Sequence, residues 1–250
     1  MKDSPAASRL VQLGFLTAAV TAWYVAGRFS VVPPLFLPPI DAVWSSLNGL
    51  IRTEEFWSAI GVTLSTIAKA YGIAVVLGVL AGYLVTRSRF LTAVLEPVIS
   101  ALFSIPITLF LPLFILVFGI GTASKVAYGA AYGFFPIALN TIAGLSRVDR
   151  RYLAAARALG ISAFGTVRHV MWPAAFPVIL TGLRIGFFIA FASVLGGETI
   201  SSVEGVGRNI ALNAELLEPA RMYAWIVVVV AAALVLNGAV SAIENRMRGQ

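Results

Sequence analysis

The chain has 250 residues, of which 59% are hydrophobic and only 12% are charged, and its mean hydropathy is +0.92. A soluble domain carries roughly 25% charged residues, so most of this surface is predicted to face lipid rather than water. The absence of cysteine excludes disulfides and cysteine-ligated metal or redox sites, and a single histidine excludes a histidine cluster. The net charge is +7, but the basic residues lie between apolar runs and form no continuous basic face, which argues against nucleic-acid binding.

Six stretches are long and apolar enough, or nearly so, to cross a bilayer, which takes about 20 residues. The first is longer than the apolar core of a signal peptide and no small-x-small cleavage site follows it, so it is expected to be a retained span. The third is short and contains Pro106 and Pro112, and it is interpreted as a kinked span continuing from an interfacial helix at about Leu91–Leu102. The sequence predicts a single all-α membrane domain with spans at about Leu10–Gly27, Ala59–Val85, Ile105–Ile120, Ala123–Leu145, Val178–Leu195 and Met222–Ser241.

The connections between the predicted spans differ in length and composition. The first outer connection begins with the proline-rich stretch 33–39, and Ile40–Leu50 is predicted to form a short amphipathic helix on the membrane surface. A second outer connection covers Thr199–Ala220, and the largest cytoplasmic connection covers Ser146–Pro177.

Basic residues in the connections predict the orientation, because lysine and arginine favour the cytoplasmic side. With a cytoplasmic N-terminus, five basic residues lie in outer segments: Arg28, Arg52, Lys125, Arg208 and Arg221. Eleven lie in inner segments: Lys2, Arg9, Arg87, Arg89, Arg147, Arg150, Arg151, Arg157, Arg168, Arg246 and Arg248. Both termini are therefore predicted to be cytoplasmic.

The large cytoplasmic connection predicts a helix, a turn and a second helix. Its alanine-rich first part favours a helix that ends at Gly160. Ser162 can cap a second short helix that runs toward Trp172, and Pro173 is expected to prevent its simple continuation. The small side chains of Ala154, Ala155 and Ala156 are expected to leave a bare surface for a partner.

This connection resembles the EAA loop of the inner-membrane permeases of binding-protein-dependent ABC importers. The family pattern is Glu-Ala-Ala, three residues, Gly, nine residues, then Ile-x-Leu-Pro. It places Ala155, Ala156 and Gly160 on the alanines and the glycine, and the closing triplet is filled by Val170, Trp172 and Pro173. The chain departs from the pattern where Ala154 replaces the glutamate and Trp172 replaces the leucine. The missing carboxylate leaves the detailed contact with a partner open, but not the docking surface.

Other segments, in the same order as in the family, extend the resemblance to the nitrate/sulfonate/taurine branch. They cover most of Leu35–Gly186, and the last sixty residues match more loosely, through Glu198 and the Gly-Val-Gly at 205–207. The matching segments are Leu35–Pro39, Leu111–Gly121 with Ala123–Lys125, Phe134–Ile137 with Asn140, and Ile179–Gly186.

The resemblance implies a type I ABC importer permease in a bacterial cytoplasmic membrane. Two permease subunits, expected to be copies of one chain, would pair, and each would dock a coupling helix in a cleft of one of two cytoplasmic ATPase subunits. A periplasmic or lipid-anchored binding protein would deliver the cargo. ATP and magnesium are expected on the ATPase, because this chain has no Gly-x-x-x-x-Gly-Lys-Ser/Thr phosphate loop and is not predicted to be an enzyme.

The residues expected to couple to the ATPase lie in one short stretch. Gly160 is expected to set the angle between the two helices, whereas by itself it would be an ordinary helix end. The second helix has an alternative reading as an interfacial helix that touches only lipid. The expected coupling residues are Ala154, Ala155, Ala156, Gly160, Ile161, Ser162, Ala163, Phe164, Val167 and Arg168.

Three charged residues within or beside the spans are candidates for the translocation pathway, because such charges are costly and usually face an interior or snorkel. Lys69 lies deepest and is the best candidate for facing a polar cavity and attracting an anion. Arg184 lies near the cytoplasmic boundary, where snorkelling or a bond to a loop carbonyl is favoured over a pathway role. Glu198 is the third candidate. The pair Gly78 and Gly82 is explained by close helix packing.

Two alternatives differ in kind from an ABC permease. A self-contained secondary transporter or channel would need its own ion-coupling site or inverted repeats, which the sequence does not display. An intramembrane enzyme would need a catalytic pair at matching depth, which the predicted spans lack. The branch resemblance suggests a small anion such as a sulfonate, taurine or nitrate as the cargo.

Overall fold

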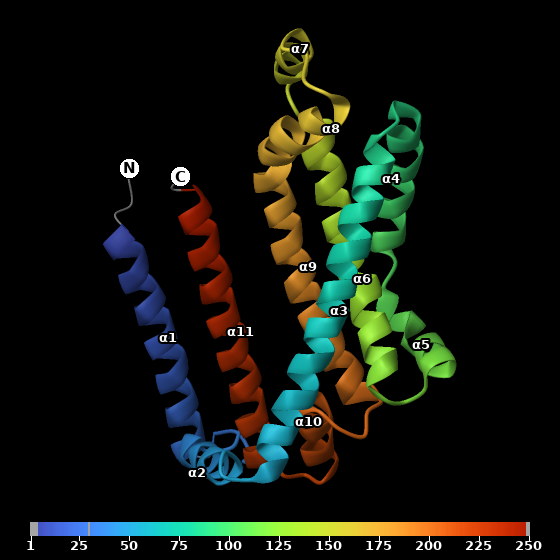
Figure 1. The fold of residues 1–250 in the computed structure, drawn as a ribbon. Coiled ribbons are helices and arrows are strands. Elements are labelled where there is room, and N and C mark those ends of the chain that lie inside the picture. Colours follow the sequence, from blue (N-terminus) through green and yellow to red (C-terminus); the bar gives the residue numbers. More distant parts are fainter. Residues whose placement is uncertain (1–4, 30, 249–250) are drawn as a thin grey trace.

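The computed structural model describes residues 5–29 and 31–248, and these residues form helices joined by turns, without a strand (Figure 1). Five helices are long and apolar enough to cross a membrane, and a bent pair would make a sixth span. In chain order the elements are α1 (Pro5–Arg28), α2 (Ile40–Leu50), α3 (Glu54–Thr86), α4 (Arg89–Ser104), the 3₁₀ turn η1 (Ile107–Phe110), α5 (Leu111–Phe118), α6 (Thr122–Ser146), α7 (Arg150–Ala158), α8 (Ala163–Thr166), the π-helical turn η2 (Val167–Met171), α9 (Trp172–Ile200), α10 (Val206–Glu215) and α11 (Pro219–Arg248).

The core of the bundle consists of α6 packed between α3 and α9. Glycines let the backbones approach closely: a Cβ at Gly78 would lie 2.8 Å from the side chain of Ile137, and one at Gly82 would lie 2.5 Å from Thr141. On the other side of α6, a Cβ at Gly133 would lie 3.1 Å from the carbonyl oxygen of Gly186. Small residues at such contacts allow helices to pack tightly in lipid, so the predicted packing role of the Gly78–Gly82 pair is confirmed.

The segment predicted as the third span, 105–120, contains η1 and α5, and the helix expected before it at about 91–102 is α4. The two helical parts, Arg89–Ser104 and Ile107–Phe118, meet at an angle of 78°. Pro106 lies in the break and explains it, because a proline ring removes a backbone donor and clashes with the preceding turn, whereas Pro112 lies in the first turn of α5, where a proline is tolerated. As Figure 1 shows, α5 leans away from the bundle instead of continuing the line of α4.

The predicted fifth span at 178–195 lies within a longer helix, because helix runs through 163–200 without the stop that was expected at Pro173. The five residues of η2 are wound as a π-helix, and the amide of Trp172 donates to the carbonyl of Val167, five residues back. A widened turn makes room for the ring of a following proline, so the helix absorbs Pro173 instead of ending there.

The proline-rich stretch 33–39 is attached to α1 and α11. The indole Nε1 of Trp23 donates to the carbonyl of Pro38 at 2.9 Å, and the hydroxyl of Tyr223 donates to the carbonyl of Phe36 at 2.8 Å. The rings of Trp23 and Tyr223 lie 5.7 Å apart, centroid to centroid. The helix that follows, α2, has the bounds that the sequence predicts.

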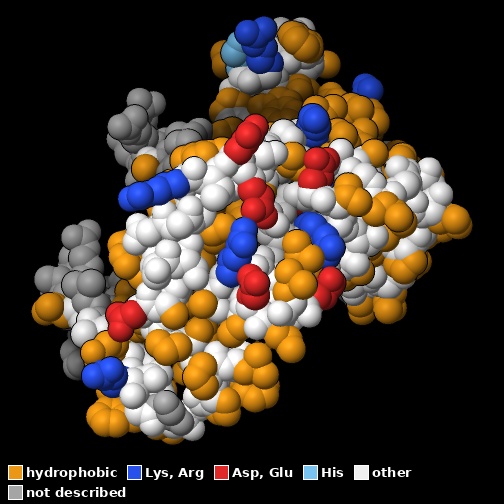
Figure 2. Space-filling view, turned by 90° about the horizontal axis from the view of Figure 1, so that it is seen from below, with side chains coloured by type: hydrophobic (Ala, Val, Ile, Leu, Met, Phe, Trp, Pro, Cys, Tyr) orange, Lys and Arg blue, Asp and Glu red, His pale blue; other side chains and the backbone are white. Residues whose placement is uncertain are grey.

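The two ends of the bundle carry different elements (Figure 1). One end carries α7 and α8, and the beginning of α1 and the end of α11 point toward it; the other carries α2 and α10. On the α2 and α10 end, acidic and basic side chains lie among one another (Figure 2), with ion pairs between Arg221 and Glu55 at 2.9 Å and between Arg208 and Glu215 at 3.5 Å. Among the basic residues used to predict the orientation, Lys2 lies outside the described residues, and the side chains of Arg9, Arg246 and Arg248 are not described.

Candidate functional site

Residues 150–171, here called the hook, project from one end of the bundle as α7, a turn and α8 with η2 (Figure 1). The Asp149 carboxylate begins the hook by accepting a hydrogen bond from the amide of Arg151 at 2.9 Å. At the end of α7, Gly160 has a φ of +69°, and its amide donates to the carbonyl of Arg157 while that of Ile161 donates to Ala156. This pair of bonds is the Schellman motif, which favours glycine at the left-handed position, so the predicted helix end is confirmed.

Ser162 begins the second helix of the hook, as predicted. Its hydroxyl accepts a hydrogen bond from the amide of Gly165 at 3.1 Å, and its carbonyl accepts one from the hydroxyl of Thr166 at 3.0 Å. Ala163 and Val167 follow in α8 and η2, which continue into α9. The turn between α7 and α8 is therefore fixed by hydrogen bonds at both of its ends.

The three alanines of the hook differ in their surroundings. Ala154 and Ala155 are exposed, but Ala156 is only 2% exposed. Ala156 lies in α7, which contacts η2, so its small side chain belongs to the packing of the hook on itself. The expectation of one bare surface formed by all three alanines is corrected to Ala154 and Ala155.

The hook exposes large apolar side chains. Leu159 is 78% exposed, Phe164 73% and Ile161 36%. Arg168 is exposed beside them, and Val167 is half-buried. Burying an exposed leucine or phenylalanine stabilises a structure by about 1.5–3 kcal/mol, so a cluster of them at a protruding turn is typical of a surface that a partner covers.

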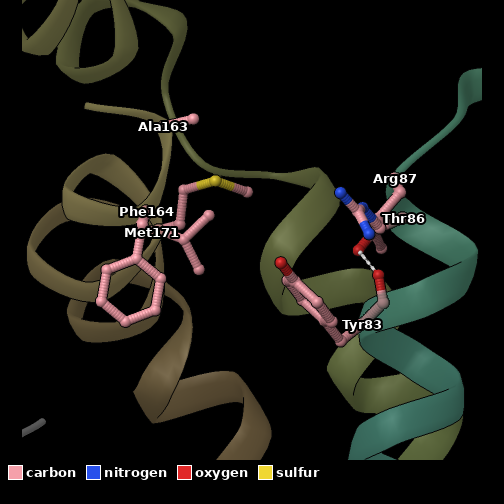
Figure 3. A pocket seen from close by; sticks show the side chains of 7 residues that line it. Tyr83, Thr86, Arg87, Ala163, Phe164 and Met171 are labelled. Atoms are coloured by element: carbon pink, nitrogen blue, oxygen red, sulfur yellow. Dashed lines mark hydrogen bonds between the residues drawn. The ribbon is translucent and has the colours of Figure 1, made fainter.

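A cavity of about 420 Å³ separates the hook from the end of α3. Figure 3 shows Tyr83, Thr86 and Arg87 on the α3 side, facing Phe164 and Met171 across the gap. Directly after the hook, the ring of Trp172 at the start of α9 stacks on Tyr83 of α3, with the ring centroids 6.4 Å apart. A force on α8 would therefore reach α3 and the first turn of α9 through packed side chains.

The structure does not bring the three pathway candidates together. Lys69 is exposed near the middle of α3. Arg184 joins α9 to α11, since its Nη2 donates to Asn237 Oδ1 at 2.7 Å and to Ser241 Oγ at 3.2 Å. Both of these acceptors are side chains of the last helix.

Glu198 is 2% exposed, and its carboxylate is bound inside the subunit. Oε2 accepts a hydrogen bond from the amide of Gly207 at 2.9 Å, and the hydroxyl of Thr63 lies within 3.0 Å of both carboxylate oxygens. The amide of Val206 in turn donates to Thr63 Oγ1 at 2.9 Å. Glu198 therefore anchors the first turn of α10 to α3 and α9.

Sequence reasoning missed Thr63 as the partner of Glu198 and assigned Lys125 wrongly to an outer connection. Lys125 lies in the first turn of α6 with no exposed surface, and its ammonium group donates to the carbonyl of Ile120 and to the hydroxyl of Ser124. The Gly-x-Gly at 205–207 was a signal for the network, because a Cβ at Gly205 would lie 2.5 Å from the carboxyl carbon of Glu198.

Comparisons with known proteins agree with this architecture. The chain is 29% identical over 242 residues to the taurine transport system permease protein TauC of Escherichia coli, which covers 95% of this chain and 88% of TauC. It is 28% identical over 236 residues to the putative aliphatic sulfonates transport permease protein SsuC of Bacillus subtilis, and the match covers 94% of this chain and 86% of SsuC. The nitrate import permease protein NrtB of Synechocystis is 29% identical over 157 residues, and the match covers 62% of this chain and 57% of NrtB.

A solved structure shows the same fold. An inward-facing structure of the MetNI methionine ABC transporter matches with a TM-score of 0.65 and 20% identity, over 75% of this chain and 94% of that chain. The family model described as "Binding-protein-dependent transport system inner membrane component" matches residues 74–249. The chain therefore belongs to this family of inner membrane components, and it is a permease subunit of an ABC importer.

Proposed function

We propose that this permease pairs with a second copy and docks its hook into a cytoplasmic ATPase subunit, so that ATP-driven closure of two ATPase subunits moves a small anion inward. The observation that carries the proposal is the exposure of Phe164, Leu159 and Ile161 on a turn that hydrogen bonds hold rigid at Gly160 and Ser162. Such a turn can transmit a push because it cannot unwind when it is loaded. The stacking of Trp172 on Tyr83 supports the transmission into the bundle.

ATP and magnesium would bind to the partner, since the sequence of this chain has no phosphate loop. The hook end would face the cytoplasm, and the α2 and α10 end would receive a periplasmic or lipid-anchored binding protein. Both termini would then be cytoplasmic in a bacterial inner membrane, which is supported by the direction of α1 and α11 in Figure 1. The cargo class follows the relatives, which are named for taurine, aliphatic sulfonates and nitrate.

The decisive experiment is copurification of the ATPase with the tagged permease from the native membrane. Phe164→Asp places a charge on the apolar tip and is expected to lower the recovered ATPase at least tenfold. Leu216→Asp is the matched control, because Leu216 is 59% exposed just after α10, at the opposite end. Equal recovery of the ATPase with the Phe164→Asp and wild-type proteins would refute docking at the hook.

Coupling is tested separately from docking. Gly160→Val is expected to leave the subunits assembled but to abolish cargo-stimulated ATP hydrolysis, because a β-branched side chain at φ +69° is strained and the angle between α7 and α8 would change. Gly160→Asn, which tolerates the left-handed region, is expected to retain most of the stimulation. Normal uptake by the Gly160→Val protein would count against a coupling role for this turn.

A further inference from the structure

Lys69 lies near the middle of α3, a helix of 33 residues, far from both of its ends. At about 1.5 Å per residue it is about 22 Å from Glu54 and about 26 Å from Thr86 along α3. The hydrocarbon core of a bilayer reaches only about 15 Å to either side of its midplane, and a lysine stem extends about 6 Å. When α3 crosses the bilayer with its middle in the core, the Lys69 ammonium cannot snorkel to either surface.

The side chain of Lys69 is exposed, and among the described residues it has neither a hydrogen bond nor an ion pair. An ammonium group facing hydrocarbon is costly, so residues of this kind face a water-filled cavity or a counter-charge. Among the side chains that the structure describes, two carboxylates of the long apolar helices are candidates for the counter-charge: Glu198 in the last turn of α9, which is occupied by Thr63 and Gly207, and Glu96 in α4. Glu96 lies only about 10 Å from the start of α4, close to the hook end, which is a different depth from that of Lys69.

Lys69 lines a groove of about 640 Å³ between α3, the end of α5 and α6. Two close contacts show which residues of α3 and α6 lie at the same level. A Cβ at Gly129 would lie 3.1 Å from the Cβ of Ala70, and a Cβ at Gly133 would lie 3.2 Å from the Cβ of Ala74. The level of Lys69 on α3 therefore corresponds to the stretch of α6 just before Gly129. Four alanines of α6 line the groove: Ala123 and Ala127 precede Gly129, and Ala130 and Ala131 follow it.

We propose that this groove is part of the translocation cavity and that Lys69 recognises the anionic group of the cargo there. This inference rests on the proposed function and adds the residue that selects for charge. A groove of several hundred cubic ångströms accommodates a small organic anion with some of its water. Phospholipid phosphates are about 15 Å away at the bilayer surface, so the anion that meets Lys69 is a dissolved solute and not a headgroup.

The absence of cysteine from the sequence permits a direct test with single-cysteine variants. Ala127→Cys places a thiol in the groove near the level of Lys69, and the permease is labelled in membrane vesicles, together with its native partners, with two membrane-impermeant reagents. One is the anionic sulfonatoethyl methanethiosulfonate, and the other is its cationic trimethylammonium analogue. The measured quantity is the ratio of the anionic to the cationic labelling rate, compared between Ala127→Cys and Ala127→Cys/Lys69→Met.

A positive charge about 7 Å away accelerates an anion by roughly 3-fold at a dielectric constant of about 80 and by roughly 50-fold at about 20, and it slows a cation correspondingly. Removing Lys69 is therefore expected to lower the rate ratio about 10-fold or more, and Lys69→Arg is expected to retain it. The control is Leu234→Cys on α11, about 22 Å from Pro219 and hence at a similar depth, which is expected to react slowly because it faces lipid.

Two results would overturn the proposal. If Ala127→Cys reacts no faster than Leu234→Cys, the groove faces lipid or is covered by a second copy of the chain. If Lys69→Met leaves the rate ratio unchanged, or if Glu96→Gln changes it as much as Lys69→Met does, the charge of Lys69 is screened or neutralised and does not attract the anion. The ATPase that copurifies with the permease from the same vesicles is also measured. A missing ATPase refutes the proposed function, whereas the labelling rates decide the role of the groove.

Discussion

The hydroxyl group of Thr63 lies 3.0 Å and 2.9 Å from the two carboxylate oxygens of Glu198, although the two residues are 135 positions apart in the chain. The same hydroxyl accepts a hydrogen bond from the amide of Val206. Thr63 therefore links α3 to both α9 and α10 at the end of the bundle opposite the hook. A buried carboxylate is tolerated only when its oxygens are hydrogen-bonded. The hydroxyl of Thr63, the carboxylate of Glu198 and the amides of Val206 and Gly207 therefore form one unit.

Thr63→Val is expected to destabilise the protein, because it preserves the shape and removes both hydrogen bonds of the hydroxyl. The oxygens of Glu198 and the amide of Val206 would lose a partner in a buried site, and such a loss costs about 1–3 kcal/mol per group. The midpoint of thermal unfolding in detergent measures the effect. Thr63→Ser keeps the hydroxyl, and its unfolding midpoint is expected to be close to that of the wild type. The same is expected of Ser65→Ala on the exposed side of α3. A wild-type midpoint for Thr63→Val would contradict this role of Thr63.

Gly207→Ala is expected to destabilise the junction of α9 and α10 by overpacking. The added Cβ would lie 2.5 Å from the carbonyl oxygen of Leu195 and 2.6 Å from the Cβ of Glu198, and backbone atoms cannot move away cheaply. Overpacking of this kind costs about 1–3 kcal/mol. Gly196→Ala on α9 is the control, because its added Cβ would have no atom within 4 Å. The prediction fails if both variants unfold at the same temperature.

Gly82→Ala is expected to loosen the contact between α3 and α6. A Cβ there would lie 2.5 Å from the Cβ of Thr141 and 2.9 Å from the carbonyl oxygen of Ala138. Gly72→Ala on the same helix adds a Cβ in open space and is expected to be neutral or slightly stabilising, since alanine favours helix by about 1 kcal/mol over glycine. Thermal unfolding of the two variants separates packing from helix propensity, and a loss in the Gly72 variant as large as that in Gly82→Ala would exclude packing as the cause.

The hydrogen bond between Arg184 and Asn237 is expected to hold α11 against α9. A double-mutant cycle with Arg184→Met and Asn237→Ala is expected to give a coupling energy of about 0.5–3 kcal/mol, because the two side chains are 2.7 Å apart. Hydrogen exchange of the amides in the second half of α11 is expected to be faster in each single variant. Strictly additive effects would show that the contact does not contribute to stability.

The places where sequence-based expectations failed have local physical causes. A span kinked by Pro106 and Pro112 was expected to continue from a helix at about 91–102, and the chain breaks at Pro106 into two helices at 78°. Pro173 was expected to stop a helix, but η2 is wound widely enough to carry the helix past it. A proline removes one hydrogen bond wherever it stands, and whether the chain bends, breaks or widens is decided by what packs against the next turn.

The class of protein, the positions of most long helices and the turn at Gly160 could be predicted from the amino-acid sequence. Apolar runs of membrane length and the spacing of glycine, serine and alanine are local properties, and local hydrogen bonds follow from them. The bond between Glu198 and Thr63, the burial of Ala156 and Lys125, and the place of Lys69 in a groove became visible only in the folded chain. Burial and pairing depend on which helix faces are brought together, and residues distant in the chain carry no local signal of each other.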